Sequence, residues 1–119
     1  MTDPLLHLID TAGWQDARAA GVLAPPSLAE VGFVHLSTPE QVALPANQLF
    51  PGRTDILLLV LDPERIGVEV RWEPGQHGDP ELMRFPHAYG PVPLDAVRAV
   101  TGYLPGPDGR FPVPDLPAW

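Results

Sequence analysis

The chain has no cysteine and few basic residues for its length. Without cysteine it forms no disulfide, has no thiolate nucleophile and builds no cysteine-ligated zinc site. Seven Lys and Arg residues stand against 15 Asp and Glu residues, which gives a formal net charge of -8. Because such a surface repels a phosphate backbone, we expect no nucleic-acid partner. A small anionic ligand can still be held locally, by backbone amides or by an arginine.

Long apolar runs are also missing. The longest aliphatic run, at residues 56–61, is far shorter than the roughly 20 residues that a membrane-spanning helix needs. The first residues lack the basic stretch and apolar core of a secretory signal peptide. We therefore expect a cytoplasmic protein with no membrane partner.

The residues that are present suit one folded domain. The chain has 119 residues, of which 45% are apolar, enough to bury a core. Its 17 prolines and 11 glycines fall mostly between apolar segments, and many prolines crowd into the last part of the chain. We predict a domain over residues 1–104, followed by a poorly ordered, proline-rich tail over residues 105–119.

The order of the expected elements indicates an α+β fold. A strand at residues 5–9 precedes a helix that begins at Asp10 or Thr11 and ends at Gly21. A short helical turn capped by Ser27 follows. Further strands are expected at residues 33–36, 55–62, 68–73, 82–85 and 97–103. Two helices near the front and strands behind them favour α+β over a doubly wound sheet.

His35 is the first candidate for chemistry, because it interrupts the apolar run Gly32-Phe33-Val34-His35-Leu36. The next residues, Ser37-Thr38-Pro39-Glu40-Gln41, have the composition of a helix start, and Pro45 is expected to kink or end that helix. The free N–H groups of a helix start suit a phosphate, a ribose hydroxyl or a carboxylate. The alternative is a structural histidine beside an ordinary helix cap.

A second histidine lies in Phe85-Pro86-His87-Ala88-Tyr89-Gly90-Pro91. An aromatic ring, an imidazole and a phenol so close together can form a wall against which a planar ring stacks. Glu73 closes the alternating strand of Val68, Val70 and Trp72, and it could act as a general acid or base. The alternatives are a proline-braced turn whose aromatics fill the core and a solvated carboxylate.

We expect His7, His35, Ser37 and His87 to line one cleft, with Gln41, Asn47, Glu73 and Tyr89 near it. The candidates for catalysis are His35, His87 and Glu73, and those for ligand binding are His7, Ser37, Thr38, Gln41, Asn47 and Tyr89. No two histidines have the spacing of a known zinc motif, so no metal is expected. Ser37 lies outside any nucleophile elbow, which argues against a serine triad. Alone, His7 would more often be a buried histidine bonded to the backbone.

Over residues 5–103 the chain resembles the bacterial DUF952 family, whose function is unassigned. The resemblance rests on Gly-Phe-Val-His-Leu-Ser at residues 32–37, Arg-Trp-Glu at 71–73 and Phe-Pro-His-Ala-Tyr-Gly-Pro at 85–91. It implies a curved or split mixed sheet with two main helices, similar to the ADP-ribosyltransferase superfamily, whose active members hold NAD in a cleft. It also implies that His7 holds a ribose. No glutamate stands beside Phe85-Pro86-His87, where the catalytic acid of that superfamily is expected; Glu73 and Glu81 are nearby.

Three kinds of function remain open at this point. The first is an enzyme that acts on NAD or another ADP-ribose-like nucleotide. The second is a non-catalytic sensor or binding module that uses the same pocket for a small-molecule ligand. The third is a structural or partner-binding protein in which the histidines only satisfy the core.

Overall fold

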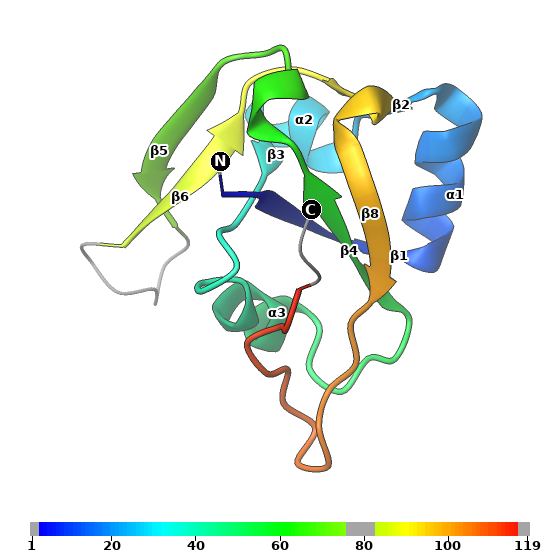
Figure 1. Cartoon of the computed structure of the whole chain (residues 1–119), viewed down its shortest axis with the longest axis vertical. Helices are drawn as coiled ribbons and strands as arrows, with labels where there is room; N and C mark the ends of the chain where they lie inside the picture. The colour runs from blue at the N-terminus through cyan, green and yellow to red at the C-terminus, as the bar shows by residue number, and fades with distance from the viewer. Residues whose placement is uncertain (1–2, 76–82, 117–119) are drawn as a thin grey trace.

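The computed structural model describes residues 3–75 and 83–116 (Figure 1). Its strands are β1 (Leu5–Asp10), β2 (Val22–Leu23), β3 (Val34–His35), β4 (Ile56–Leu61), β5 (Val70–Pro74), β6 (Arg84–Ala88), β7 (Val92–Pro93) and β8 (Val97–Gly102). Its helices are α1 (Thr11–Ala20), α2 (Pro26–Val31) and α3 (Ala43–Leu49), with 3-10 turns η1 (Pro63–Arg65) and η2 (Leu94–Ala96). The described chain is thus α+β, as expected, with one more α-helix than the two expected.

The strands form three small sheets rather than one. Their orders are β1-β4-β8, β3-β6-β5 and the pair β2-β7. Every ladder between the described strands is antiparallel, so the expected mixture of parallel and antiparallel strands is not found there. Strand β5 begins at Val70 rather than at residue 68, and strand β6 begins at Arg84 rather than at residue 82. Residue 82 lies outside the described part of the chain.

Within residues 3–75 and 83–116, one isolated bridge, between Leu6 and Ser37, joins the two larger sheets. The amide of Leu6 donates to the carbonyl of Ser37 at 2.7 Å, and the amide of Ser37 donates back to Leu6 at 2.8 Å. One residue earlier, the amide of Leu36 still donates to Pro86 of β6 at 3.0 Å. The segment after β3 therefore changes its hydrogen-bonding partner from β6 at Leu36 to β1 at Ser37. This change places His35 and Ser37 where the two sheets meet.

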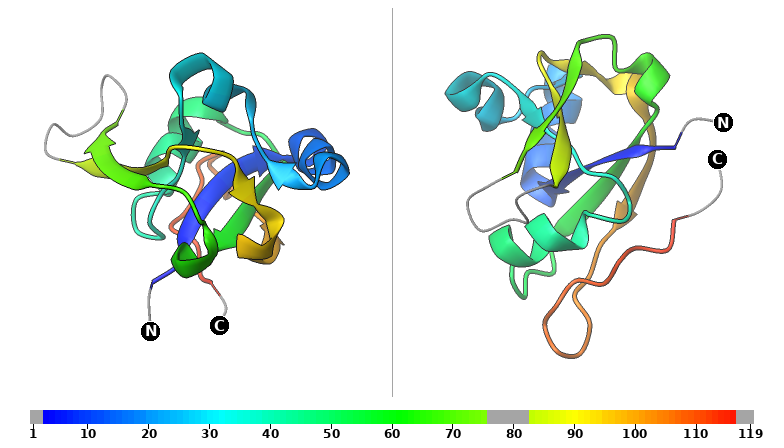
Figure 2. Two further views of the ribbon diagram at one scale, coloured as in Figure 1. Left: turned by 90° about the horizontal axis from the view of Figure 1, so that it is seen from above. Right: turned by 90° about the vertical axis from the view of Figure 1, so that its left-hand side faces the viewer.

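The central strand β4 is buried on both faces, which explains its unbroken apolar sequence. One face carries Leu59 and Leu61, which pack with α1, β2 and the inner side of β3 and β6. The other carries Leu58 and Val60, which pack with α3 and the C-terminal segment. The views in Figure 2 show α3 and that segment together on one side of the β1-β4-β8 sheet. No helix among residues 3–75 and 83–116 has the length and apolarity to cross a membrane.

The first helix follows its local signals. Asp10 caps it by accepting a hydrogen bond from the amide of Gly13 at 2.7 Å. At the other end Gly21 adopts a left-handed conformation, φ 77°, and its amide donates to Ala17 at 2.9 Å. A residue with a Cβ atom is strained in that conformation, so glycine ends the helix there.

The prediction that a helix begins at residues 37–41 is wrong. Residues 37–42 form a turn in which Gln41 accepts from the Thr38 amide through its side chain at 3.0 Å and donates to the Thr38 carbonyl through its own amide at 3.2 Å. Helix α3 begins only at Ala43, and Pro45 lies in its first turn, where no amide hydrogen is needed. Pro45 therefore neither kinks nor ends the helix. Similarly, Ser27 does not cap α2; its hydroxyl donates to the Phe33 carbonyl at 3.0 Å.

The C-terminal segment is attached to the domain at Phe111, where we expected a loose tail. Phe111 is only 3% exposed, among the residues that cover the β1-β4-β8 sheet. The Asn47 side chain donates to the Phe111 carbonyl at 3.1 Å and accepts from its amide at 2.7 Å. The Tyr103 hydroxyl donates to the Pro112 carbonyl, and burial raises the pKa of Tyr103 to about 12.

Candidate functional site

The register of the β3-β6-β5 sheet brings the two motif histidines together. His35 lies opposite His87, and Arg71 of β5 lies opposite His87 on the other side. Directly opposite residues share a face of the sheet, so these side chains point the same way, as does Glu73, which is two residues from Arg71. The alternate residues Val34 and Ala88 are fully buried on the other face.

A pocket of about 250 Å³ lies between this face and helix α3. Its walls are mostly apolar, and its few polar side chains include two histidines and a serine. The lining residues are Phe33, His35, Leu36, Ser37, Pro45, Gln48, Leu49, Pro74, Gly75, Phe85 and His87. Of the nine predicted site residues, His35, Ser37 and His87 line this pocket.

His87 is the most tightly held of these side chains. Its ring is 5% exposed, and Phe33 stacks on it with ring centroids 4.0 Å apart and planes at 12°. Its Nδ1 lies 2.9 Å from Glu73 Oε1. The same oxygen accepts a 2.5 Å hydrogen bond from the Tyr89 hydroxyl. The imidazole is thus fixed in position and in rotation, as a group that transfers a proton needs to be.

The charge of Glu73 sets the tautomer of His87. Hydrogen bonds from Tyr89 and then from His87 hold the pKa of Glu73 below its usual value, and the shared bond raises the pKa of Tyr89. An ionised carboxylate only accepts hydrogen bonds, so Nδ1 of a neutral His87 carries the hydrogen. No buried side-chain nitrogen among the described residues lacks a partner. Nε2 of His87 makes no hydrogen bond to another described residue, and in this tautomer it can accept a hydrogen bond.

His35 and Ser37 supply the other polar groups of the wall. The His35 ring is exposed and meets Phe33 and His87 edge-on, at centroid distances of 4.9 and 5.6 Å. Burial of part of the ring and then repulsion from His87 lower the pKa of His35, so its imidazole is neutral at pH 7. Ser37 is 6% exposed, and its hydroxyl makes no hydrogen bond to another described residue. Both groups are available to a ligand.

His7 lies behind the pocket rather than in its wall. It is 6% exposed, and its Nδ1 lies 2.7 Å from the carbonyl oxygen of His35. Burial lowers the pKa of His7 to about 4, against the smaller opposing effect of that hydrogen bond. His7 is therefore a neutral donor that holds the backbone of β3 in place. The expectation that it lines the cleft is corrected.

Three further predicted residues do not line the pocket either. Thr38 lines a second pocket, described below. Gln41 braces the turn before α3, because its side-chain amide also donates to the Arg84 carbonyl at 2.8 Å. Asn47 belongs to the attachment of the C-terminal segment. Glu73 and Tyr89 act behind His87, and Glu81 lies outside the described residues.

The sequence-based list also missed part of the wall. Phe33 is absent from the predicted site residues, although a residue two before His35 on an extended strand faces the same way. No local sequence pattern indicates that Pro45 and Leu49 of α3 form part of the pocket wall. Exposure of an apolar side chain, 49% for Leu49, becomes visible only in the folded chain. Among residues 3–75 and 83–116, no three His, Asp or Glu side chains gather closely enough to hold a metal ion.

The fold and the pocket thus define a small α+β domain with split antiparallel sheets and a histidine-lined pocket. The chain belongs to the DUF952 family, described as proteins of unknown function, whose model matches residues 8–100.

Solved structures of another protein are similar to this chain over most of its length. A crystal structure of the protein CC0527 from Caulobacter crescentus superposes with a TM-score of 0.76 at 29% identity, covering 92% of this chain and 94% of that one. The solution NMR structure of CC0527 superposes with a TM-score of 0.74 at 29% identity, covering 90% of each chain. None of the curated proteins matches the chain.

Proposed function

We propose that the pocket between β3, β6 and α3 binds the ring-and-ribose end of a small ligand, such as NAD or another ADP-ribose-like nucleotide. The observation that carries this proposal is His87. Its ring is stacked on Phe33 and fixed by Glu73, and it lies in a pocket wall with Ser37, whose hydroxyl makes no hydrogen bond to another described residue. A buried imidazole that is held by two such restraints in a pocket wall is arranged for a ligand more than for packing.

The chemistry of the wall suits a planar ring attached to a sugar. Phe33 and Phe85 offer apolar and aromatic surface, while Ser37 and neutral His35 can each donate and accept hydrogen bonds to ribose hydroxyls. Drug-sized ligands occupy pockets of roughly 300–1,000 Å³, so about 250 Å³ accommodates one end of a dinucleotide. The remainder of the ligand would lie outside, over the pocket rim.

An ADP-ribosyltransferase-like fold belongs to the same proposal. The splitting of the strands into separate sheets, joined at Leu6 and Ser37, supports it. The implied ribose contact of a first-strand histidine is reassigned, because His7 is enclosed behind β3. We assign that contact to His35 and Ser37, whose side chains line the pocket.

In an enzymatic reaction His87 would accept a proton from a ligand hydroxyl at Nε2. Glu73 would then stabilise the imidazolium and hold its orientation, as a positioning residue that does not touch the ligand. Non-catalytic binding is the second candidate function, and one observation favours it. The described pocket lining contains no carboxylate, so no group there stabilises an oxocarbenium-like transition state.

A thermal-shift comparison tests the binding proposal. NAD, ADP-ribose and nicotinamide riboside are added to the native chain and to His35→Ala, Ser37→Ala and Glu30→Gln, the last being an exposed control outside the pocket. A ligand at a hundred times its Kd stabilises by about 2.7 kcal/mol. We expect a shift in the native chain and the control that is lost in the other two variants. No shift with any nucleotide, or an equal shift in all variants, would refute the proposal.

NAD turnover then separates the two candidate functions. Release of nicotinamide from NAD by the native chain, and its loss in His87→Gln with binding retained, would identify an enzyme. Binding without turnover would identify a sensor or binding module.

A further inference from the structure

A second pocket, of about 390 Å³, lies on the other face of strand β5. It is enclosed by the start of β1, the turn before α3, the first residue of η1 and the outer strand β5. The lining residues are Asp3, Pro4, Leu5, Thr38, Pro39, Glu40, Pro63, Val70 and Trp72. None of them lines the histidine pocket, so the two pockets are separate.

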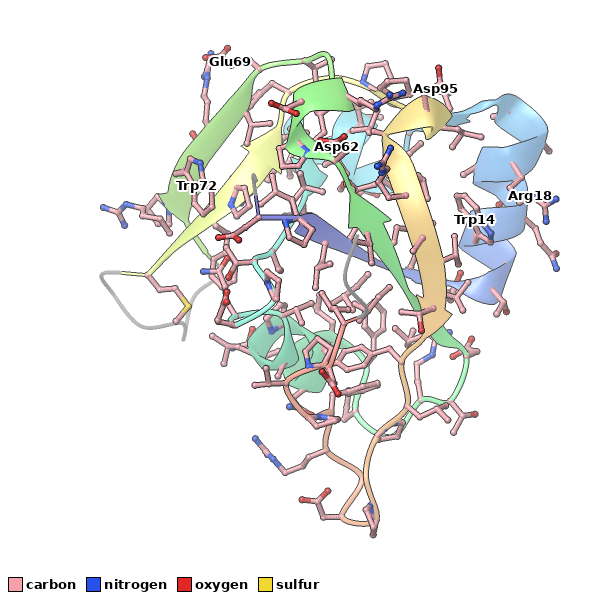
Figure 3. All side chains as sticks on the ribbon, viewed as in Figure 1. Trp14, Arg18, Asp62, Glu69, Trp72 and Asp95 are labelled. Carbon is pink, nitrogen blue, oxygen red and sulfur yellow. The ribbon has the colours of Figure 1, made fainter. Side chains whose placement is uncertain are left out.

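Trp72 is the most unusual part of this wall. It lies on β5, the edge strand of its sheet (Figure 3), and its side is opposite to that of Glu73. It is 53% exposed, although large aromatic side chains normally bury most of their surface. No ring contact or cation stacks on this indole among the described residues, whereas Arg71 next to it lies over Tyr89 at 4.4 Å. An open tryptophan face in a pocket is a surface to which a ligand can bind.

The charges around the indole select the kind of ligand. Asp3 and Glu40 are both exposed, and the lining residues that the structure describes include no Arg, Lys or His. The whole chain adds a net charge of -8. This field repels anions and attracts cations. The faces of Trp rings bind cations best among aromatic side chains, and prolines and aliphatic residues complete the apolar part of the wall.

We infer that this second pocket binds an organic cation, namely an ammonium group on a short apolar stem, with the cation over Trp72 and near Glu40. Such a group is carried by free quaternary amines and by lysine side chains. The inference is independent of the proposed nucleotide site, because it uses none of the residues of that pocket.

NMR titration of the indole signal of Trp72, identified by its absence in Trp72→Phe, tests the inference. Choline chloride is compared with 3,3-dimethylbutan-1-ol, its neutral carbon isostere, at constant total chloride. A lysine-containing peptide is compared in the same way with its norleucine analogue. Binding to Trp72→Leu and Glu40→Gln is followed at the backbone amides of Val70 and Thr38, with Glu30→Gln as the charge-matched control.

We expect saturable binding of choline and at least fivefold weaker binding of the neutral isostere. Trp72→Leu and Glu40→Gln should each weaken choline binding by about two- to fivefold, as the loss of one exposed cation–π or ionic contact predicts. Glu30→Gln should bind like the native chain. Tighter binding of the lysine peptide than of choline would identify a protein side chain as the source of the cation, and the reverse a free amine.

Three outcomes would overturn the inference. They are no choline binding, equal binding of choline and its isostere, and unchanged binding in both Trp72→Leu and Glu40→Gln. Failure of the nucleotide site is distinguishable, since His35→Ala should leave choline binding intact even where it removes nucleotide binding.

Discussion

Glu73 and His87 are joined across two antiparallel strands, with Glu73 Oε1 2.9 Å from His87 Nδ1, although the register pairs Glu73 with Phe85. The hydrogen bond therefore runs diagonally between the strands. The Tyr89 hydroxyl donates to the same Glu73 oxygen at 2.5 Å. A diagonal bond lets the histidine ring remain stacked on Phe33 while its Nδ1 is engaged. The tautomer of His87 is thereby fixed before any ligand arrives.

The first prediction concerns that tautomer. In the native chain, long-range ¹H–¹⁵N spectra should show neutral His87 with the hydrogen on Nδ1, because an ionised Glu73 can only accept. Glu73→Leu removes the acceptor, so the spectra should show a mixture of both tautomers. Tyr89→Phe keeps the carboxylate and should retain the Nδ1–H form. A native His87 with its hydrogen on Nε2 would show that Glu73 does not orient the ring.

The second prediction separates the two pocket histidines by stability. His35 is exposed and makes no side-chain hydrogen bond to a described residue, so His35→Ala should change the free energy of unfolding by less than about 1 kcal/mol. His87 is buried, stacked and hydrogen-bonded, so His87→Ala should cost about 2–3 kcal/mol. Urea unfolding of both variants at pH 7 measures the difference. An equal loss of stability in the two variants would contradict the different environments of His35 and His87.

Sequence analysis located the two histidine motifs because an imidazole in an apolar run is a local feature. It also identified α1 correctly, because Asp10 and Gly21 act on their own neighbours in the chain. The failures come from distant partners. The Ser37 to Gln41 stretch looks like a helix start, but Gln41 binds both Thr38 and Arg84, and the helix begins later.

Two of the predicted site residues, Asn47 and His7, lie outside the pocket lining because of distant partners. Asn47 looked like a polar residue near a ligand, but its partner is Phe111, 64 residues away. His7 looked like a pocket residue, yet the antiparallel pairing of β1 with Leu59 places it behind β3. Such pairings follow from the way the sheets meet, which no local pattern in the chain specifies.

The third prediction tests the attachment of the C-terminal segment. Asn47→Ala removes both hydrogen bonds to the Phe111 backbone, which should cost about 1–3 kcal/mol and accelerate amide exchange at Phe111. Asn47→Asp retains the acceptor for the Phe111 amide but sets a carboxylate oxygen against the Phe111 carbonyl, so it should also destabilise the chain. Val113→Ala, a change at a 62% exposed residue of the same segment, is the control and should have little effect. Unchanged exchange at Phe111 in Asn47→Ala would contradict the role of this contact.

The fourth prediction is a loss of stability in mild acid caused by His7. Its pKa in the folded chain is lowered from 6.5 to about 4 by burial. At pH values between these two pKa values, His7 is protonated in the unfolded chain but neutral in the folded chain, so acid favours unfolding. The contribution of His7 is therefore complete above pH 6.5, decreases as the pH falls and is gone below pH 4. The shift corresponds to about 3 kcal/mol over that interval.

Urea unfolding at pH 7.5, 5.5 and 4.5 measures this loss in the native chain and in His7→Gln. Glutamine can still donate to the His35 carbonyl but does not titrate, so its stability should fall less steeply over the same range. Because the pKa of His35 is also lowered, some pH dependence should remain in the variant. The comparison depends on slopes, so it holds even where His7→Gln is less stable at every pH. Parallel slopes in the two chains would show that His7 is charged in the fold and does not act as a neutral donor behind β3.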